Sequence, residues 1–366
     1  MSTESNLATM LNKLLQILIL ACFVLFSSCL NKKDYDVGLV CEINNTGDYV
    51  IKWEIFPAIK GNVKIYRSDH PDNFANKEVE LELPVQNGIA IMKKGDFSRS
   101  YFKLVFGKDL HTITSNRIMK TENILNFREI GGYYNQHGQQ VKWGKLYRSG
   151  FLNDIGQSDL ALLDALHIKT VVDLRTDEEI ATVPATFFME HTYRIPLTGI
   201  EILPFVEKVI KGQMKKGDAL VFQQDLHAAL VKHNTDKFKR YFEILADSSN
   251  YPIMVYCTLG KMRTGIVMFL TLTALDVDIE QIYRDYMLSN DCMDFSKMVN
   301  KADRLSHEVQ EALTVLLAPQ KEAIEYTRKY IEKEYGSLDD YFEKELQLTA
   351  PKREKLKELL LYPPNY

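Results

Sequence analysis

Short apolar runs separated by turn-forming residues fill the first third of the chain. Polar clusters such as Asn44–Asp48 and Asn87-Gly88 divide the runs at intervals that suit short strands. Because several short strands at regular spacing are typical of two packed antiparallel sheets, this pattern predicts a small all-β sandwich domain over residues 30–112. The runs that we expect to form strands are 37–43, 49–55, 62–66, 89–92 and 101–106.

Beyond residue 112 the pattern alternates between helix and strand. Ser158 fits an N-cap before a helix whose leucines share one face, and the β-branched run Thr170–Leu174 follows. Such alternation is typical of α/β folds. We expect residues 201–246 to be mainly helical and to cap a pocket, and the chain to be helical from Ile279 onward. Residues 113–366 are therefore predicted to form an α/β domain, a central sheet flanked by helices with a helical C-terminal part.

The N-terminus carries a targeting pattern. Leu14–Phe26 is apolar, is preceded by Lys13 and is followed by Ser27, Ser28 and Cys29. The apolar stretch is shorter than the roughly 20 residues of a spanning helix and fits a signal-peptide core. We expect residues 1–29 to be a lipoprotein signal, with Cys29 lipidated and the protein anchored to a membrane of the bacterial cell envelope. An uncleaved anchor or a plain secretory signal are the alternatives.

Composition narrows the function classes. The chain has 366 residues, is 46% hydrophobic and carries a net charge of −4. The length favours two domains, and the negative charge argues against general nucleic-acid binding. The cysteines at positions 22, 29, 41, 257 and 292 show no metal-ligand spacing, so we predict no metal and no other cofactor.

The strongest chemical signal is the segment Cys257–Gly265. It lies between the apolar run Pro252–Tyr256 and the helix-like run Ile266–Leu275. The first N–H groups of a helix are unpaired and carry the positive end of its dipole, so such a turn is an anion site. Gly260 allows the backbone to curl around the anion. The residues expected to supply the cradle are Thr258, Leu259, Gly260, Lys261 and Met262.

Three side chains of this segment suit phosphoryl transfer. The positive field favours the thiolate form of Cys257, placed for in-line attack on phosphorus. Arg263 can hold two phosphate oxygens at once. The hydroxyl of Thr264 can donate a hydrogen bond to the sulfur and help it leave in the second step. The alternative is a buried structural cysteine at the end of a strand.

The segment resembles the signature of the protein tyrosine phosphatase superfamily, and more narrowly that of bacterial tyrosine/serine and lipid phosphatases with the pattern HCxxGKDRTG. The resemblance covers residues from about 120 to 366 and implies hydrolysis of phosphomonoesters through a cysteinyl-phosphate. The implied substrates are phosphotyrosine or phosphoserine proteins, or phosphoinositides and inositol phosphates. The supporting segments are Asn126–Gly132, Leu146–Gly150, Thr170–Arg175, Asp285–Asn290 and Tyr341–Leu360.

Two positions depart from that pattern. Tyr256 stands where relatives have histidine, and Met262 stands where many have an aspartate that is a candidate leaving-group acid. Because methionine cannot donate a proton, a pseudophosphatase that binds phosphorylated ligands without turnover is an alternative function.

A rhodanese-type sulfurtransferase is a further alternative, because it also uses a loop cysteine, but its loop usually lacks the arginine-threonine pair.

Candidate acids and cations lie elsewhere in the chain. Asp173 ends a β-branched run, where ligand sites of open α/β sheets lie; it is equally suited to acid catalysis and to a structural role. Glu178, Glu179 and Glu201 are further options.

In relatives, a lysine at the position of Lys261 goes with multiply phosphorylated ligands; a solvated loop lysine is the alternative. Arg128 and Arg175 either line the pocket or form structural ion pairs. A second cationic stretch is either a pocket wall or a solvated helix face; it contains Lys208, Lys211, Lys215 and Lys216.

The β-domain carries no predicted chemistry. The stretch around Trp53 and Val63–Arg67 resembles fibronectin type III or immunoglobulin-like domains. A domain of that kind most often acts as a spacer or a docking surface, and fold alone would not supply a function.

Overall fold

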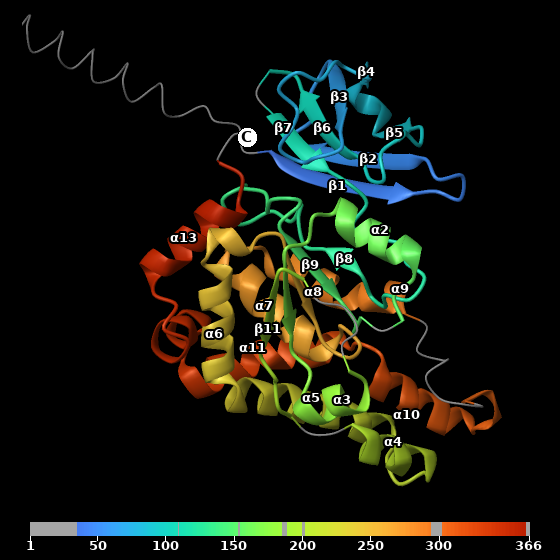
Figure 1. Cartoon of the computed structure of the whole chain (residues 1–366), viewed down its shortest axis with the longest axis vertical. Coiled ribbons are helices and arrows are strands. Elements are labelled where there is room, and N and C mark those ends of the chain that lie inside the picture. The colour runs from blue at the N-terminus through green and yellow to red at the C-terminus, as the bar shows by residue number, and fades with distance from the viewer. Residues whose placement is uncertain are drawn as a thin grey trace, which may run out of the picture.

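The computed structural model describes residues 35–108, 110–152, 154–184, 189–199, 202–293 and 302–363. An all-β unit stacks on one end of a larger α/β unit (Figure 1). The predicted signal region with Cys29 lies outside the described residues, as does Glu201. No helix within the described ranges combines the length and the apolar character needed to cross a bilayer.

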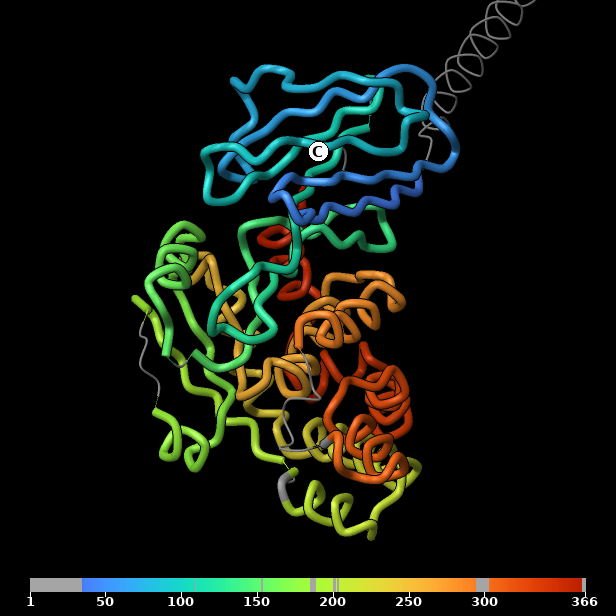
Figure 2. The backbone as a smooth tube through the Cα atoms, turned by 90° about the vertical axis from the view of Figure 1, so that its right-hand side faces the viewer, coloured from blue at the N-terminus to red at the C-terminus, as the bar shows by residue number. Residues whose placement is uncertain are grey.

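The N-terminal unit is a sandwich of two antiparallel sheets, which confirms the predicted all-β fold (Figure 2). One sheet has the order β1-β2-β5 and the other β4-β3-β6-β7. The strands are β1 (Asp36–Ile43), β2 (Tyr49–Phe56), β3 (Asn62–Ser68), β4 (Leu81–Pro84), β5 (Ile89–Met92), β6 (Tyr101–Phe106) and β7 (Leu110–Thr114).

Alternation of buried and exposed side chains builds the core of this sandwich. In β2 the inward positions include Ile51 and Trp53, and the Trp53 indole donates to the carbonyl of Val85 over 2.8 Å. The sequence pattern identified five of the strands but not β4 and β7. Because β7 runs to Thr114, the boundary expected after residue 112 falls inside a strand of the sandwich.

The second unit has a five-stranded sheet with the order β11-β10-β12-β9-β8, parallel except for β8. Every residue of β9, β10 and β12 is buried, as expected for parallel strands covered by helices on both faces. The strands are β8 (Arg128–Glu129), β9 (Leu146–Ser149), β10 (Thr170–Asp173), β11 (His191–Arg194) and β12 (Ile253–Tyr256).

Helices surround this sheet and form most of the C-terminal part. The helix α2 begins at Gln157 with Gly156 as its N-cap, so the predicted N-cap Ser158 lies inside the first turn. The helices are α2 (Gln157–Ala165), α3 (Asp177–Thr182), α4 (Leu203–Ile210), α5 (Lys216–His233), α6 (Thr235–Leu245), α7 (Met262–Ala274), α8 (Ile279–Met287), α9 (Ser289–Cys292), α10 (His307–Leu317), α11 (Lys321–Tyr335), α12 (Leu338–Asp340) and α13 (Ala350–Leu360).

Three helices share a core of their own. Apolar side chains of α4, α5 and α10 pack together apart from the main core, which is centred on α7 and the sheet. We call α4, α5 and α10 the helical layer. In Figure 1 the helical layer and α3 lie at the bottom, at the end of the α/β unit that is farthest from the sandwich.

The sandwich and the α/β unit are joined by a buried interface. Tyr101 and Ile113 of the sandwich share a core cluster with Trp143, whose indole donates to the carbonyl of Ile113 over 2.9 Å. The buried side chains of Arg99 and Glu129 form an ion pair of 2.5 Å across the same boundary.

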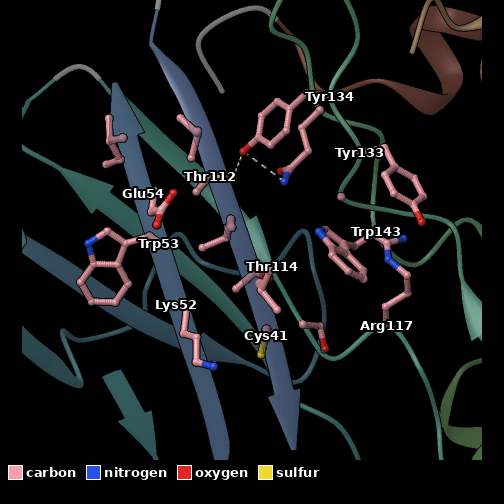
Figure 3. A pocket seen from close by; sticks show the side chains of 18 of the residues that line it. Cys41, Lys52, Trp53, Glu54, Thr112, Thr114, Arg117, Tyr133, Tyr134 and Trp143 are labelled. Atoms are coloured by element: carbon pink, nitrogen blue, oxygen red, sulfur yellow. Dashed lines mark hydrogen bonds between the residues drawn. The ribbon is translucent and has the colours of Figure 1, made fainter. Parts of the chain in front are cut away.

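A cleft beside this interface is lined by β1, β2 and residues such as Tyr134 (Figure 3). The segment 257–263 is not part of its described lining.

Candidate active site

The segment after β12 forms the strand–loop–helix turn that the sequence predicted. Cys257 directly follows β12, and α7 begins at Met262. Gly260 lies in the left-handed region with φ of +62°, and a Cβ there would collide with the backbone of Ser149 and Gly150. Only glycine fits this tight, left-handed position at low cost. The loop 257–263 therefore has the curled shape that anion binding requires.

Two side chains hold the carbonyl groups of this loop from behind. Asn126 Nδ2 donates to the carbonyls of Leu259 over 3.1 Å and Gly260 over 2.9 Å. Arg148 Nη2 donates to the Gly260 carbonyl over 2.6 Å. Because the N–H and C=O of a trans peptide point in opposite directions, fixing these carbonyls turns the next amides to the other side of the loop. This is the backbone arrangement that we expect of a nest of N–H donors.

Asp285 anchors the two arginines beneath the loop. Its carboxylate accepts from Arg148 Nη1 over 2.6 Å, Arg128 Nε over 3.2 Å and the Tyr133 hydroxyl over 3.1 Å. Burial alone would raise the pKa of Asp285, but the charges of Arg128 and Arg148 hold it well below its usual range. Arg128 is fully buried, so the structure places it in a supporting ion pair and not in the pocket.

Arg263 is held at the mouth of the loop by Glu179. Nη1 of Arg263 lies 2.5 Å from Oε2 of Glu179, and Nη2 lies 2.6 Å from Oε1. Burial would raise the pKa of Glu179, but the hydrogen bonds and charge of Arg263 lower it to about 2. The Thr258 hydroxyl donates to Glu179 over 2.5 Å, and Glu179 accepts from the Thr176 amide as part of a capping box at the start of α3.

This environment gives Glu179 a different part from the one that the sequence suggested. A carboxylate with a pKa of about 2 is ionised near neutral pH and is a poor proton donor. Its two-point contact instead fixes the plane of the guanidinium, which leaves the fork of Arg263 in one orientation.

Asp173 and Arg175 bind each other and not the loop. Arg175 Nη2 lies 2.8 Å from Asp173 Oδ2, which also accepts from the Tyr256 hydroxyl over 2.8 Å. Arg175 Nη1 donates to the carbonyl of Val183. Both charged side chains are almost fully buried. The structure therefore favours the structural alternative for Asp173, and it places Arg175 outside the phosphate cradle. Tyr256, which replaces the usual histidine, contributes to this cluster.

Cys257 and Thr264 lie at the bottom of the turn. Cys257 is 3% exposed, and Thr264 is fully buried. Within the described part of the chain, the Thr264 hydroxyl finds no hydrogen-bond partner. Burial lowers the pKa of Arg263, but Glu179 and Cys257 together raise it above its ordinary value. The sulfur thus lies within the field of the guanidinium that the sequence assigned to phosphate.

Lys261 points into the protein and not towards the mouth. Its side chain is 2% exposed, and Nζ donates to the carbonyl of Leu317. Burial lowers the pKa of Lys261 to about 8, against the opposing charge of Cys257. Met262 packs against both the main core and the core of the helical layer.

The lysines of the second cationic stretch lie on helix surfaces. Lys208 stacks on the Phe205 ring, Lys211 pairs with Glu207, and Lys216 lies 4.0 Å from Glu311. Lys215 precedes α5 as its N-cap. These contacts favour the solvated helix face. Among the described residues, no three His, Cys, Asp or Glu side chains lie together in a way that could hold a metal ion.

The profile of the tyrosine phosphatase family matches residues 119–362. The chain belongs to this family. The triple specificity protein phosphatase PtpB of Mycobacterium tuberculosis is 24% identical over 265 residues, which cover 59% of this chain and 89% of the relative. A tyrosine-protein phosphatase of Nostoc commune is 28% identical over 145 residues, which cover 39% of this chain and 47% of the relative. The protein is thus a phosphatase with the expected fold.

Two solved structures also align with part of the chain. The catalytic domain of the PP-IP phosphatase Siw14 from S. cerevisiae aligns at 14% identity with a TM-score of 0.27, over 58% of this chain and 98% of that one. TpbA from P. aeruginosa aligns at 16% identity with a TM-score of 0.22, over 49% of this chain and 89% of that one.

Several supporting residues had no assigned role in the sequence. Asn126, Arg148 and Asp285 occur in segments that resemble the family, but their spacing along the chain gave no sign that they meet beneath one loop. Glu179 was one of several possible acids, and its pairing with Arg263 became visible only in three dimensions.

Proposed function

We propose that the protein hydrolyses phosphomonoesters through a cysteinyl-phosphate on Cys257. The thiolate attacks phosphorus, the ester P–O bond breaks, and the leaving oxygen takes up a proton from water. Water then attacks the phosphorus, the P–S bond breaks, and phosphate and thiolate are released. The observation that carries the proposal is the Glu179–Arg263 pair at the mouth of the loop that begins with Cys257.

The proposed division of labour follows the geometry. Arg263 and the loop amides bind the equatorial phosphate oxygens and stabilise their charge in the transition state. Thr264, whose buried hydroxyl is unpartnered within the described residues, donates to the sulfur as it leaves. Asp285 and Asn126 keep the loop in shape. A protonated acid for the leaving oxygen is not among these residues, so activated aryl phosphates are the expected best substrates.

The physiological substrates that we propose are phosphotyrosine or phosphoserine proteins, or inositol-based phosphates. The M. tuberculosis relative is named a triple specificity protein phosphatase, which supports a broad substrate range. The family match over residues 119–362 supports phosphotyrosine first.

Turnover of 4-nitrophenyl phosphate by wild type and Cys257→Ser tests the proposal. We expect hydrolysis by the wild type and a loss of more than about a thousandfold in the variant, because the hydroxyl of serine is a far weaker nucleophile at neutral pH. Undiminished turnover by Cys257→Ser would overturn the mechanism.

A second function is favoured by one observation. Met262 occupies the loop position of a candidate acid, which supports a pseudophosphatase that binds phosphorylated ligands without turnover. Binding of orthovanadate by the wild type, combined with no release of nitrophenol, would favour this alternative.

We also propose that the protein is anchored in the bacterial envelope through lipidated Cys29. Residues 30–34 separate that cysteine from the first described residue, so the sandwich would lie between anchor and phosphatase unit as an immunoglobulin- or fibronectin-type spacer. Its two antiparallel sheets support that assignment. If Cys29→Ser stayed as firmly in the membrane fraction as wild type, lipidation would not be the anchor.

A further inference from the structure

We infer that Lys261 and Met262 are positioning residues that dock the helical layer onto the loop 257–263, and that Lys261 does not bind a second substrate phosphate. The enzyme therefore prefers substrates with a single phosphate group over multiply phosphorylated ones. The preference rests on the proposed function; the docking role stands on contacts within the protein.

The ammonium of Lys261 caps the C-terminal end of α10. It donates to the carbonyl of Leu317, the last residue of that helix. A helix C-terminus carries unpaired carbonyls and the negative end of the dipole, so a cation is stabilising there. Gln223 of α5 donates to the carbonyls of Val315, Leu316 and Ala318 at 2.5, 2.9 and 3.0 Å. The C-terminal end of α10 is therefore held both by Lys261 of the loop and by Gln223 of α5.

Met262 makes the apolar half of the same junction. Its side chain packs against the main core and against the core of the helical layer. An aspartate at this position would place a carboxylate between two apolar clusters, at a considerable cost in desolvation, whereas a flexible thioether fills such a gap well. Two consecutive loop residues thus face the layer, one by a polar contact and one by packing.

The other buried arginines around the loop also have internal partners. Arg128 and Arg148 bind Asp285, and Arg175 binds Asp173. Of the basic side chains assigned to the pocket, Arg263 is the one whose guanidinium lies at the mouth, together with Glu179. Recognition of a second phosphate needs its own cation or set of donors, and these residues do not supply it.

The test compares two soluble substrates with the full-length protein: a phosphotyrosine peptide and inositol hexakisphosphate. The variants are Lys261→Met, which keeps the aliphatic stem, and the matched control Lys208→Met, which removes an exposed charge from the same layer. We expect wild type to favour the peptide at least tenfold in kcat/KM. Lys261→Met should lower kcat/KM about tenfold on any substrate that wild type turns over. The ratio of kcat/KM between the two substrates should stay within about twofold of the wild-type ratio. Lys208→Met should change neither kcat/KM nor this ratio.

Amide hydrogen exchange gives a readout that is independent of activity. In Lys261→Met, exchange at residues 313–318 should be at least tenfold faster than in wild type and in Lys208→Met, because the carbonyl of Leu317 loses its charged donor. Unchanged exchange there would overturn the docking role. A selective loss of the hexakisphosphate activity in Lys261→Met, with the peptide activity unaffected, would overturn the inference that Lys261 does not bind a second substrate phosphate.

The outcomes separate this inference from the proposed function. Should Lys261→Met fail to fold, the wild-type ratio between the two substrates decides, and a preference for the hexakisphosphate refutes the inference. Should wild type hydrolyse neither substrate, nor an aryl phosphate, the proposed function fails and the substrate preference falls with it. The exchange comparison then still decides whether Lys261 docks α10.

Discussion

Glu179 and Arg263 face each other in a two-point ion pair, with Oε2 2.5 Å from Nη1 and Oε1 2.6 Å from Nη2. The arginine belongs to the first turn of α7 and the glutamate to α3, two helices that follow neighbouring parallel strands. The pair therefore ties the guanidinium of Arg263 to the helix that follows the adjacent strand and limits it to one orientation.

Replacing Glu179 with glutamine should release that orientation. Gln keeps the capping contact to Thr176 but loses the charge that fixes the guanidinium. We expect kcat/KM for an aryl phosphate to fall about 10–100-fold, with KM raised. Steady-state kinetics of Glu179→Gln and of the exposed neighbour Glu178→Gln provide the comparison. Equal, small effects in both variants would show that the pair does not position Arg263.

Loss of the Thr264 hydroxyl should slow the second step of the reaction. The buried hydroxyl follows Arg263 in α7, where it can donate to the leaving sulfur. In Thr264→Ala we expect a burst of nitrophenol followed by turnover at least about tenfold slower than wild type. Thr264→Ser should restore wild-type kinetics. A uniform loss of rate without a burst would place Thr264 outside the dephosphorylation step.

Asp285 should be the most sensitive structural position near the loop. Asp285→Asn leaves Arg128 and Arg148 buried without their counter-charge, a change that typically costs about 3–5 kcal/mol. Urea unfolding should show this loss, whereas Asp291→Asn, an exposed change on α9, should stay within about 0.5 kcal/mol of wild type. Wild-type stability in Asp285→Asn would refute its role as an anchor.

His227 should make stability depend on pH. Burial, with the nearby charge of Lys261, lowers its pKa from 6.5 to about 3, so the folded protein holds it neutral. The unfolded chain binds a proton below about pH 6.5, which favours unfolding. The contribution of neutral His227 to the free energy of unfolding is therefore complete above pH 6.5. It is lost as the pH falls towards 3, by up to about 1.4 kcal/mol per pH unit.

Urea unfolding measured between pH 7 and 4.5 separates the effect of His227 on stability from the titration of most carboxylates. His227→Gln should flatten the pH dependence, whereas His233→Gln, at the exposed end of α5, should keep the wild-type slope. Identical slopes in all three proteins would contradict a neutral buried His227.

Local patterns predicted the loop well because its geometry is encoded in consecutive residues. Gly260, the strand before Cys257 and the helix after it all appear in one short segment, and the structure has each of them. The sandwich was predicted from periodicity for the same reason, although β4 and β7 escaped detection.

The other features of the site depend on contacts between residues whose pairing the local sequence pattern does not reveal. Asp285 lies 137 positions from Arg148 and Lys261 lies 56 positions from Leu317. A lysine in a phosphate-binding loop suggests a ligand contact, yet here a helix end supplies the competing acceptor. The orientation of Asp173 was decided by Arg175, two positions further along the chain, and by Tyr256, which lies opposite Asp173 on the neighbouring strand β12.

Trapping the intermediate tests the central claim most directly. Acid quench of the enzyme during turnover of an aryl phosphate, followed by peptide mass spectrometry, should find one phosphate on Cys257, and more of it in Thr264→Ala than in wild type. Turnover that continues in Cys257→Ser, or phosphate found on another residue while Cys257 stays unmodified, would contradict the account.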